Sequence, residues 1–432
     1  MQRIILSIAL LATSGCSTIL GIGDITLIDA GAMHDDAGAM RGDAGAVLEG
    51  PMPLRLPDPS AYAIKTTLSY ADADALVSVL GASNARSVDN LLTHANRPTM
   101  PLCQTDVGGA LYPLSSVDPG SYGFCWSMND PGSVEWIPQG ITTTADAAAE
   151  HSYDGHEVVV IAWRNDAATS TRITVAPASG HADGAVYRHV LLVAPTTGAS
   201  FNPIACSAGG ALWYGDLLYL ACTDSIKIFD WRYIFSAYQE PTNFCGGKVG
   251  KILDGATERY CADGMAYFMM QVGQIASPGG NVQFSSISLD RVSSPSQLVV
   301  SAYASATGGK LARFDIDRAM QPGNLVASDV YDMPFAFVRG AVTRGDKFWF
   351  QSSDDRVATS GGLADNYGTL RVWDASAKRF LGYTSAYGAT SISFWPGSAT
   401  APGTPHPADV LYTLTDHPGN RAVIAIHRTF FE

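Results

Sequence analysis

Residues 209–231 read GGALWYGDLLYLACTDSIKIFDW and contain three short apolar runs separated by Gly and Asp residues. The first run is rich in Gly, the second is apolar at nearly every position, and the third ends in aromatic residues beside an Asp. Short β-branched and aromatic runs between turn residues are typical of consecutive β-strands. A strand that is apolar at every position is expected to be covered on both faces.

The same pattern recurs along the chain, in five units whose first runs begin near residues 140, 209, 283, 338 and 388. Further strand-like runs lie at 187–195, 266–273 and 379–384. One small sheet buries too little apolar surface to be stable alone, whereas sheets stacked around an axis cover each other. The sequence therefore predicts an all-β fold, a β-propeller with five blades, or six if residues 98–137 or 245–275 form another. A β-sandwich or two stacked β-domains is the alternative.

The first fifteen residues have the layout of an export signal, with Arg3 before an apolar run that is too short to span a bilayer. Cys16 follows Ser14 and Gly15, as in bacterial lipoprotein signals, so we expect Cys16 to be lipidated. Ser17 after that cysteine favours the outer membrane. Plain secretion without a lipid is the alternative.

Four regions follow from these patterns. Residues 1–15 are the signal peptide, and residues 16–60, with their DAGAM-type repeats and later prolines, are a lipidated cysteine and disordered tether. Residues 61–137 form an N-terminal segment that is helical over 70–97 and otherwise irregular and disulfide-tied. Residues 138–432 form the propeller.

Seven cysteines are present, and six remain if Cys16 carries lipid. An even number in an exported chain predicts disulfides, although six cysteines allow 15 pairings. Their closeness in sequence favours Cys103–Cys125, Cys206–Cys222 and Cys245–Cys261. Six buried free thiols are the alternative.

The net charge of −13 argues against a nucleic-acid partner, because phosphates require clusters of Lys and Arg. It also argues against binding to anionic lipid, so the only membrane contact expected is the lipid anchor. We expect a monomer that binds an unknown protein, small molecule or glycan.

Several strings resemble segments of a family of exported bacterial β-propeller-like proteins and lipoproteins; these are WIPQGITTTADA, YRHVLLVAP, SAGGALWYGDLLYLACTDSIKIFDWRYI, SFWPG and LYTLTDHPGNRAVIAI, within residues 136–428. The resemblance implies the architecture and no particular reaction. Members often carry His where Ser207 stands, and many carry an acidic pair where Ala389, Thr390 and Ser391 stand. A metal or catalytic site formed there in relatives would be lost or altered in this chain.

In a propeller the first strand of each blade lines the central channel, and ligands gather at its mouth. That placement predicts an axial site with one residue from each unit: Gln139, Ser207, Ser285, Arg339 and Ser391. Arg339 is the only charged residue of the five and would hold an anion. Small residues at a crowded axis are the structural alternative.

Catalytic signatures are weak: the chain has no G-x-S-x-G and no H-E-x-x-H motif. His189 lies in an apolar strand and is expected to be a hydrogen-bonded strand residue. No cofactor is predicted, although calcium at Asp315 and Asp317, or at Asp354, Asp355 and Asp365, is an alternative to solvated turns. The sequence favours a surface-anchored binding or scaffold module that is not an enzyme. A propeller hydrolase or lactonase with an axial metal is the alternative.

Overall fold

The structure is a computed structural model, and the residues that it describes are 52–102, 121–179, 184–239, 244–305, 308–353, 367–397, 409–419 and 421–428. Among these residues 55% lie in strands and 9% in helices, which confirms the predicted all-β class. Within the same ranges no helix has the length and apolar character needed to cross a membrane.

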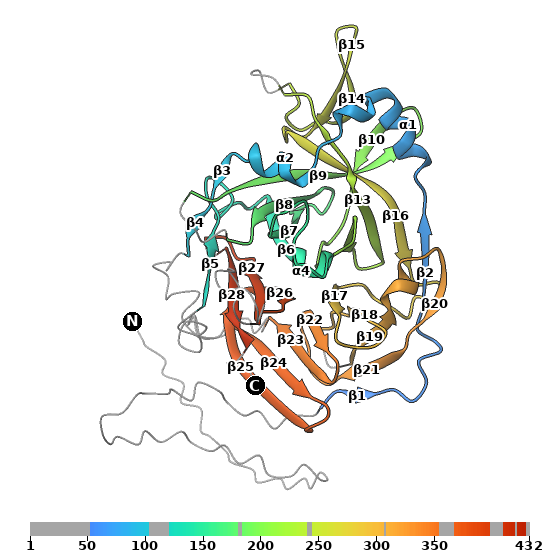
Figure 1. The fold of residues 1–432 in the computed structure, drawn as a ribbon, viewed down its shortest axis with the longest axis vertical. Coiled ribbons are helices and arrows are strands. Elements are labelled where there is room, and N and C mark those ends of the chain that lie inside the picture. The colour runs from blue at the N-terminus through green and yellow to red at the C-terminus, as the bar shows by residue number, and fades with distance from the viewer. Residues whose placement is uncertain are drawn as a thin grey trace, which may run out of the picture. The chain divides into compact units, whose positions relative to one another are not determined.

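Units one and two form one large sheet that is nearly closed on itself (Figure 1). Its strands run in the order β11-β12-β13-β16-β9-β8-β7-β6, and the two end strands, β6 and β11, lie against each other. All neighbours are antiparallel except β9 and β16, which pair in parallel. The bounds are β6 (Trp136–Thr143), β7 (Val158–Asn165), β8 (Thr171–Pro177), β9 (Val186–Thr196), β11 (Gly210–Tyr214), β12 (Leu217–Ala221), β13 (Ser225–Ser236) and β16 (Tyr267–Ala276).

Units three to five form smaller antiparallel sheets, and the fourth strand of unit five comes from the N-terminal side of the chain. That strand, β5 (Tyr122–Cys125), pairs with β28. The third unit has β17 (Ser286–Asp290), β18 (Gln297–Ser301), β19 (Gly309–Asp315) and β21 (Asp329–Met333). The fourth has β22 (Val338–Arg344), β23 (Lys347–Ser352), β24 (Tyr367–Asp374) and β25 (Arg379–Tyr387). The fifth has β26 (Ala389–Trp395), β27 (Val410–Thr415) and β28 (Ala422–His427), with β4 (Met100–Pro101) beyond β5.

The apolar runs of the sequence correspond to these strands. Every residue of β18 and β27 is buried, as is each residue from Val158 to Trp163 in β7. Strands of this kind are covered on both faces, so the apolar runs correctly predicted which strands are buried.

The prediction of five separate sheets needs correction at units one and two. Their outer strands β9 and β16 are long, with 11 and 10 residues, and hydrogen-bond to each other instead of ending as free edges. Unpaired strand edges favour such pairing. The two units therefore share one barrel-like sheet.

The first strands of the five units lie side by side in a closed series: β6, β11, β17, β22, β26 and again β6. Three glycines mark how closely they approach. A Cβ atom on Gly140 would lie 2.7 Å from the Ala208 carbonyl oxygen, one on Gly210 would lie 2.5 Å from the Ile287 nitrogen, and one on Gly340 would lie 2.7 Å from the Ile392 nitrogen. Glycine is required where backbones approach this closely.

The N-terminal segment contains the predicted helices and several short strands. The helices are α1 (Ala71–Leu80) and α2 (Val88–Thr93), joined through the 3-10 turn η1 (Ala82–Asn84), and Ser87 caps α2. Strand β1 (Leu54–Arg55) pairs with β21, although the sequence assigned these residues to the tether. The segment also contains β2 (Ala63–Leu68) and β3 (Arg97–Pro98). The short elements later in the chain are α4 (Thr144–Ala147), β10 (Ser200–Pro203), α5 (Ile316–Ala319) and β20 (Gly323–Val326).

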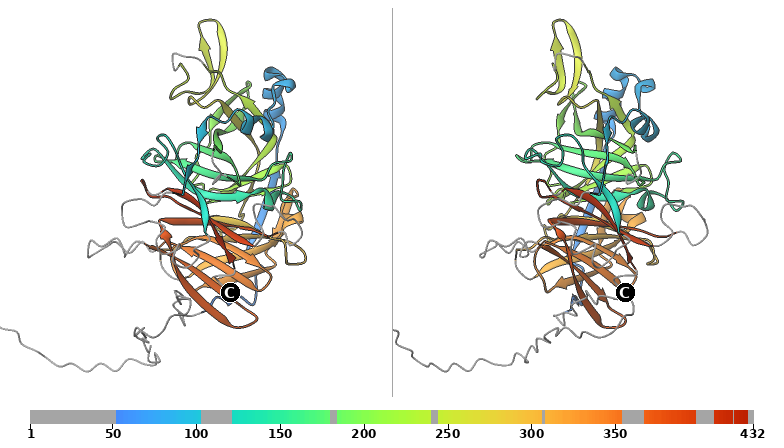
Figure 2. Two further views of the ribbon diagram at one scale, coloured as in Figure 1. Left: turned by 60° about the vertical axis from the view of Figure 1, so that its left-hand side comes forward. Right: turned by 90° about the vertical axis from the view of Figure 1, so that its left-hand side faces the viewer.

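A two-stranded hairpin projects from the rest of the fold (Figure 2). It consists of β14 (Val249–Asp254) and β15 (Thr257–Ala262). This hairpin and β16 account for the described strands of residues 245–275, and those of 98–137 join other sheets. Among the described residues, neither segment forms a further sheet of the size expected for a blade.

Two of the three predicted disulfides are confirmed. Cys206 is bonded to Cys222 and Cys245 to Cys261. Cys103 lies outside the described residues, as do Cys16 and the signal and repeat segments, so the pairing Cys103–Cys125 stays a prediction. Disulfides persist in oxidising compartments, and the two bonds indicate an exported protein.

Candidate functional site

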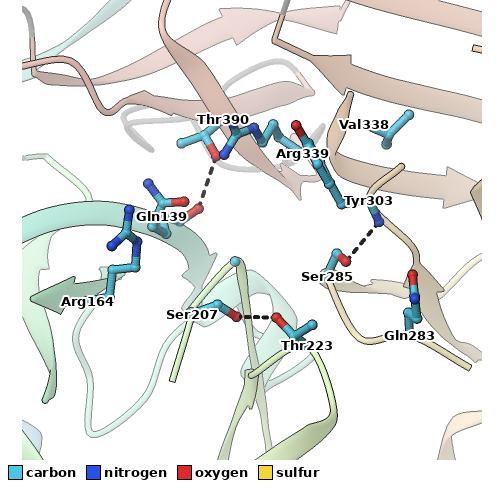
Figure 3. Close-up of a pocket in the computed structure, with 11 residues that line it drawn as sticks. Gln139, Arg164, Ser207, Thr223, Gln283, Ser285, Tyr303, Val338, Arg339 and Thr390 are labelled. Carbon is cyan, nitrogen blue, oxygen red and sulfur yellow. Dashed lines mark hydrogen bonds between the residues drawn. The ribbon is translucent and has the colours of Figure 1, made fainter. Parts of the chain in front are cut away.

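A cavity of about 340 Å³ lies where the starts of the first strands meet (Figure 3). Figure 3 shows its side chains arranged around an open centre. The lining residues come from all five units: Gln139, Arg164, Ser207, Gly209, Thr223, Gln283, Ser285, Tyr303, Val338, Arg339 and Thr390. We call this the axial cavity.

Four of the five predicted site residues line this cavity, namely Gln139, Ser207, Ser285 and Arg339. The fifth predicted residue, Ser391, does not line the cavity, but its neighbour Thr390 does. Successive side chains in a strand point to opposite faces, so an error of one position moves a residue away from the cavity. Ser391 is 1% exposed, and its Oγ has no hydrogen-bond partner among the described residues.

Three further lining residues, at or just after the end of the second strand of a unit, were not predicted from the sequence. Arg164 lies at the end of β7, Thr223 follows β12, and Tyr303 follows β18. In an antiparallel hairpin the end of the second strand lies opposite the start of the first. The hairpin pattern was therefore a signal that these residues reach the same mouth.

Hydrogen bonds hold the lining side chains to neighbouring elements. Ser207 Oγ and Thr223 Oγ1 lie 2.9 Å apart, and Ser285 Oγ accepts a bond of 2.8 Å from the Tyr303 amide. Gln139 Nε2 donates to Asp416 Oδ2 over 3.2 Å. These contacts tie the first strands to the loops around them, and they leave hydroxyl and amide groups along the wall.

The charged lining residues among those described are both arginines. Arg339 Nε donates to Ser353 Oγ over 2.9 Å, and its guanidinium lies 5.1 Å from the centre of the Tyr303 ring. Arg164 Nη1 donates to two carbonyl oxygens of its own turn, Asn165 at 3.4 Å and Asp166 at 3.3 Å. No Asp, Glu or His is among the described residues that line the cavity.

The rim of the axial cavity has strained backbone. Ala208, Thr223 and Phe337 have φ angles of 55°, 68° and 59°, and each either lines the cavity or directly precedes a residue that does. Positive φ is costly for β-branched and bulky residues and is concentrated at functional sites. The Cys206–Cys222 disulfide lies beside this strain, since each cysteine immediately precedes a lining residue in sequence.

Buried carboxylates join neighbouring units at the far ends of the first strands. Asp146 Oδ2 accepts bonds of 2.9 Å from Thr142 and from Ser393, on β6 and β26. Burial raises the pKa of Asp146 to about 6. Asp290 joins β17 to β22 by accepting bonds of 2.9 Å from Thr343 Oγ1 and the Gly345 amide.

A second polar cluster surrounds Asp130, which follows β5. Its carboxylate accepts bonds from Arg172 at 2.8 Å, Tyr187 at 2.7 Å and Arg97 at 3.2 Å. Burial opposes ionisation of Asp130, but the hydrogen bond from His189 and the charges around it hold the pKa of this carboxyl well below its usual range.

His189 is a hydrogen-bonded strand residue, as predicted. Burial, followed by the charge of Arg172, lowers the pKa of His189 to about 3, so its ring is neutral. Its Nε2 then donates to Asp130 over 3.1 Å, and its Nδ1 accepts from the Thr174 hydroxyl at 2.7 Å. Thr174 is 0% exposed, so this hydroxyl serves packing and is not open to a substrate.

The candidate calcium ligands have structural roles where they are described. Asp315 caps α5 by accepting a bond from the Arg318 amide, and Asp317 accepts one from the Tyr214 hydroxyl at 2.6 Å. Asp354, Asp355 and Asp365 lie outside the described residues. In the described part of the chain no group of three or more His, Cys, Asp or Glu residues is placed to hold a metal ion.

No protein-family model matches the chain, and a search of curated proteins finds no match. The family resemblance drawn from the sequence therefore stays a prediction.

Proposed function

We propose that this protein is an exported binding module whose axial cavity takes a small polar ligand. The observation that carries the proposal is that strand starts from all five units contribute side chains to one cavity. Its wall offers hydroxyl, amide and guanidinium groups, which bind ligands through hydrogen bonds. Ligand sites are typically concave, with a few polar groups that fix the orientation of the ligand.

The same proposal includes a five-bladed propeller as the architecture. It is supported by the closed series of first strands and by the separate sheets of four or five strands that three of them begin. Units one and two would then be two blades whose outer strands have joined. The likeness to exported propeller-like proteins is part of this proposal.

A lipid anchor at Cys16, in the outer membrane, is the location that we propose. It is supported by the signal layout of residues 1–15 and by the two disulfides. The variant Cys16→Ala should move the protein from the membrane fraction to the soluble fraction. Membrane retention equal to that of the wild type would contradict the anchor and leave the binding proposal intact.

The hypothesis of a binding module is better supported than the hypothesis of a hydrolase with an axial metal. Metal-dependent hydrolysis needs carboxylates or imidazoles that converge on the ion, and the described lining residues supply neither. Their hydroxyl and amide groups are suited to holding a ligand.

The test is a thermal-unfolding screen against sugars, sugar acids, amino acids and nucleosides, because a ligand that binds only the folded state raises the unfolding temperature. The variant Gln283→Trp places a large side chain at an exposed lining position, and Gln321→Trp makes the same change at an exposed position away from the cavity. We expect at least one ligand to stabilise the wild type and Gln321→Trp but not Gln283→Trp. No stabilising ligand, or equal stabilisation of all three proteins, would overturn the proposal.

A further inference from the structure

The described lining of the axial cavity differs in charge from the chain as a whole. The chain has a net charge of −13, yet the charged residues among the described lining residues are Arg164 and Arg339. Asp416 Oδ2 accepts a hydrogen bond from the lining residue Gln139, and its Oδ1 lies 2.6 Å from His417 Nδ1. A concave site lined by one sign of charge attracts ligands of the opposite sign.

Arg164 has the contacts of a guanidinium that is held in place and still able to bind. It is half-buried at the end of β7, and its Nη1 is fixed by two backbone carbonyls of the following turn. Its Nε and Nη2 have no hydrogen-bond partner among the described residues. The guanidinium fork matches the two oxygens of a carboxylate, and such charge-assisted bonds are stronger than neutral ones.

The remaining wall is suited to hydroxyl groups. Ser207, Thr223, Gln283 and Ser285 donate and accept hydrogen bonds without carrying charge, and Gln283 is exposed. The Tyr303 ring adds an aromatic surface to the same wall. The cavity volume of about 340 Å³ is at the small end of ligand sites.

We infer that the ligand is a small hydroxylated carboxylate of the sugar-acid class, and that Arg164 binds its carboxylate. This inference rests on the proposed function and narrows it. Arg339 contributes positive charge on the other side of the wall, while the hydroxyl and amide residues bind the hydroxyl groups of the ligand.

The experiment compares three acids with their neutral counterparts: galacturonate with galactose, glucuronate with glucose, and gluconate with sorbitol. Binding of each to the full-length protein is measured by titration calorimetry at low ionic strength. We expect at least one acid to bind about tenfold or more tightly than its neutral counterpart, since one charge-assisted hydrogen bond has about that effect. Added salt should weaken that binding.

Three variants assign the effect to one residue. Arg164→Gln should weaken binding of the acid about tenfold or more and leave the neutral sugar unchanged, whereas Arg164→Lys should keep most of the acid preference. Arg379→Gln removes an exposed arginine of β25 and should change neither. The unfolding temperature of each variant without ligand shows whether it is folded.

Each outcome decides a different statement. Equal binding of acids and neutral sugars, or an unchanged acid preference in Arg164→Gln, would overturn the inference and leave the proposed function standing. If none of the six compounds binds but the broader screen finds another ligand, the inference is overturned and the proposed function still stands. If the broader screen also finds none, the proposed function itself fails.

Discussion

Asp130 Oδ1 accepts a hydrogen bond of 2.8 Å from Arg172 Nη2, and both side chains are almost completely buried. The Arg172 guanidinium also lies 4.6 Å from the ring centre of Trp136 and 4.8 Å from that of Trp163. Asp130 follows β5, whereas Arg172 belongs to β8. One buried ion pair therefore joins the segment after β5, the strand that completes unit five, to the sheet of unit one.

Replacing Asp130 with Asn should destabilise the protein strongly, because it leaves the Arg172 charge buried without its partner. A loss of about 3–5 kcal/mol is typical of such a change. The control is Asp332→Asn, which breaks the partly exposed pair with Lys310 and should cost less than about 1 kcal/mol. Urea unfolding of both variants tests the prediction, and equal losses would contradict it.

The contribution of Asp146 to the stability of the wild type should fall as the pH rises from about 4 to about 6. Its pKa is about 6 in the folded protein and about 3.9 in an unfolded chain, so the folded state holds the proton more tightly. The favourable contribution is complete below pH 4 and is lost as the carboxyl ionises, which costs up to about 3 kcal/mol.

The variant Asp146→Asn isolates this contribution. It should be more stable than the wild type at pH 8 and no more stable at pH 4, because the amide never ionises. Asp72→Asn, at an exposed position of α1, should follow the wild-type profile. Unfolding midpoints measured from pH 4 to pH 8 decide the matter, and a constant difference between Asp146→Asn and wild type would refute the assignment.

Gly140→Ala should destabilise the protein, because its methyl group would lie 2.7 Å from the Ala208 carbonyl oxygen in the neighbouring unit. Overpacking of this kind costs about 1–3 kcal/mol. Gly132→Ala is the matched change, since nothing lies within 4 Å of its added methyl group. If both variants unfold at the same urea concentration, the first strands do not approach as closely as described.

Breaking the Cys206–Cys222 bond with a double Ser substitution should cost about 3 kcal/mol, the value expected for a loop of this length. The bond lies beside the strained residues Ala208 and Thr223, so the double variant should also weaken binding at the axial cavity.

Peptide mapping without reduction should find this bond, Cys245–Cys261 and Cys103–Cys125. A map that links Cys206 to another cysteine would disprove the pairing.

The sequence predicted strands well wherever burial on both faces left an apolar run, as in β7, β12 and β27. It did not predict β5 as the fourth strand of unit five, because the pairing with β28 joins residues 122–125 to residues 422–425, which are far apart in sequence. The β9–β16 pairing was missed for a similar reason, since edge-to-edge contacts leave no periodic signal. Short-range patterns specify strands, but partners distant in sequence depend on packing.

The candidate site shows the same division. Gln139, Ser207, Ser285 and Arg339 were found because each begins a unit, whereas Arg164 needed the hairpin geometry that brings the end of β7 to the same mouth. Asp130 could not have been assigned from its sequence context. Its partners Arg97, Arg172, Tyr187 and His189 come from three strands, β3, β8 and β9, that only the folded chain brings together.

The pairing of β5 with β28 also sets an order of events during synthesis. Residues 122–125 are synthesised long before residues 422–425, to which they hydrogen-bond. Their sheet stays incomplete until residues 422–427 of β28 have also been made. A chain that ended before β28 would leave β5 without its partner strand.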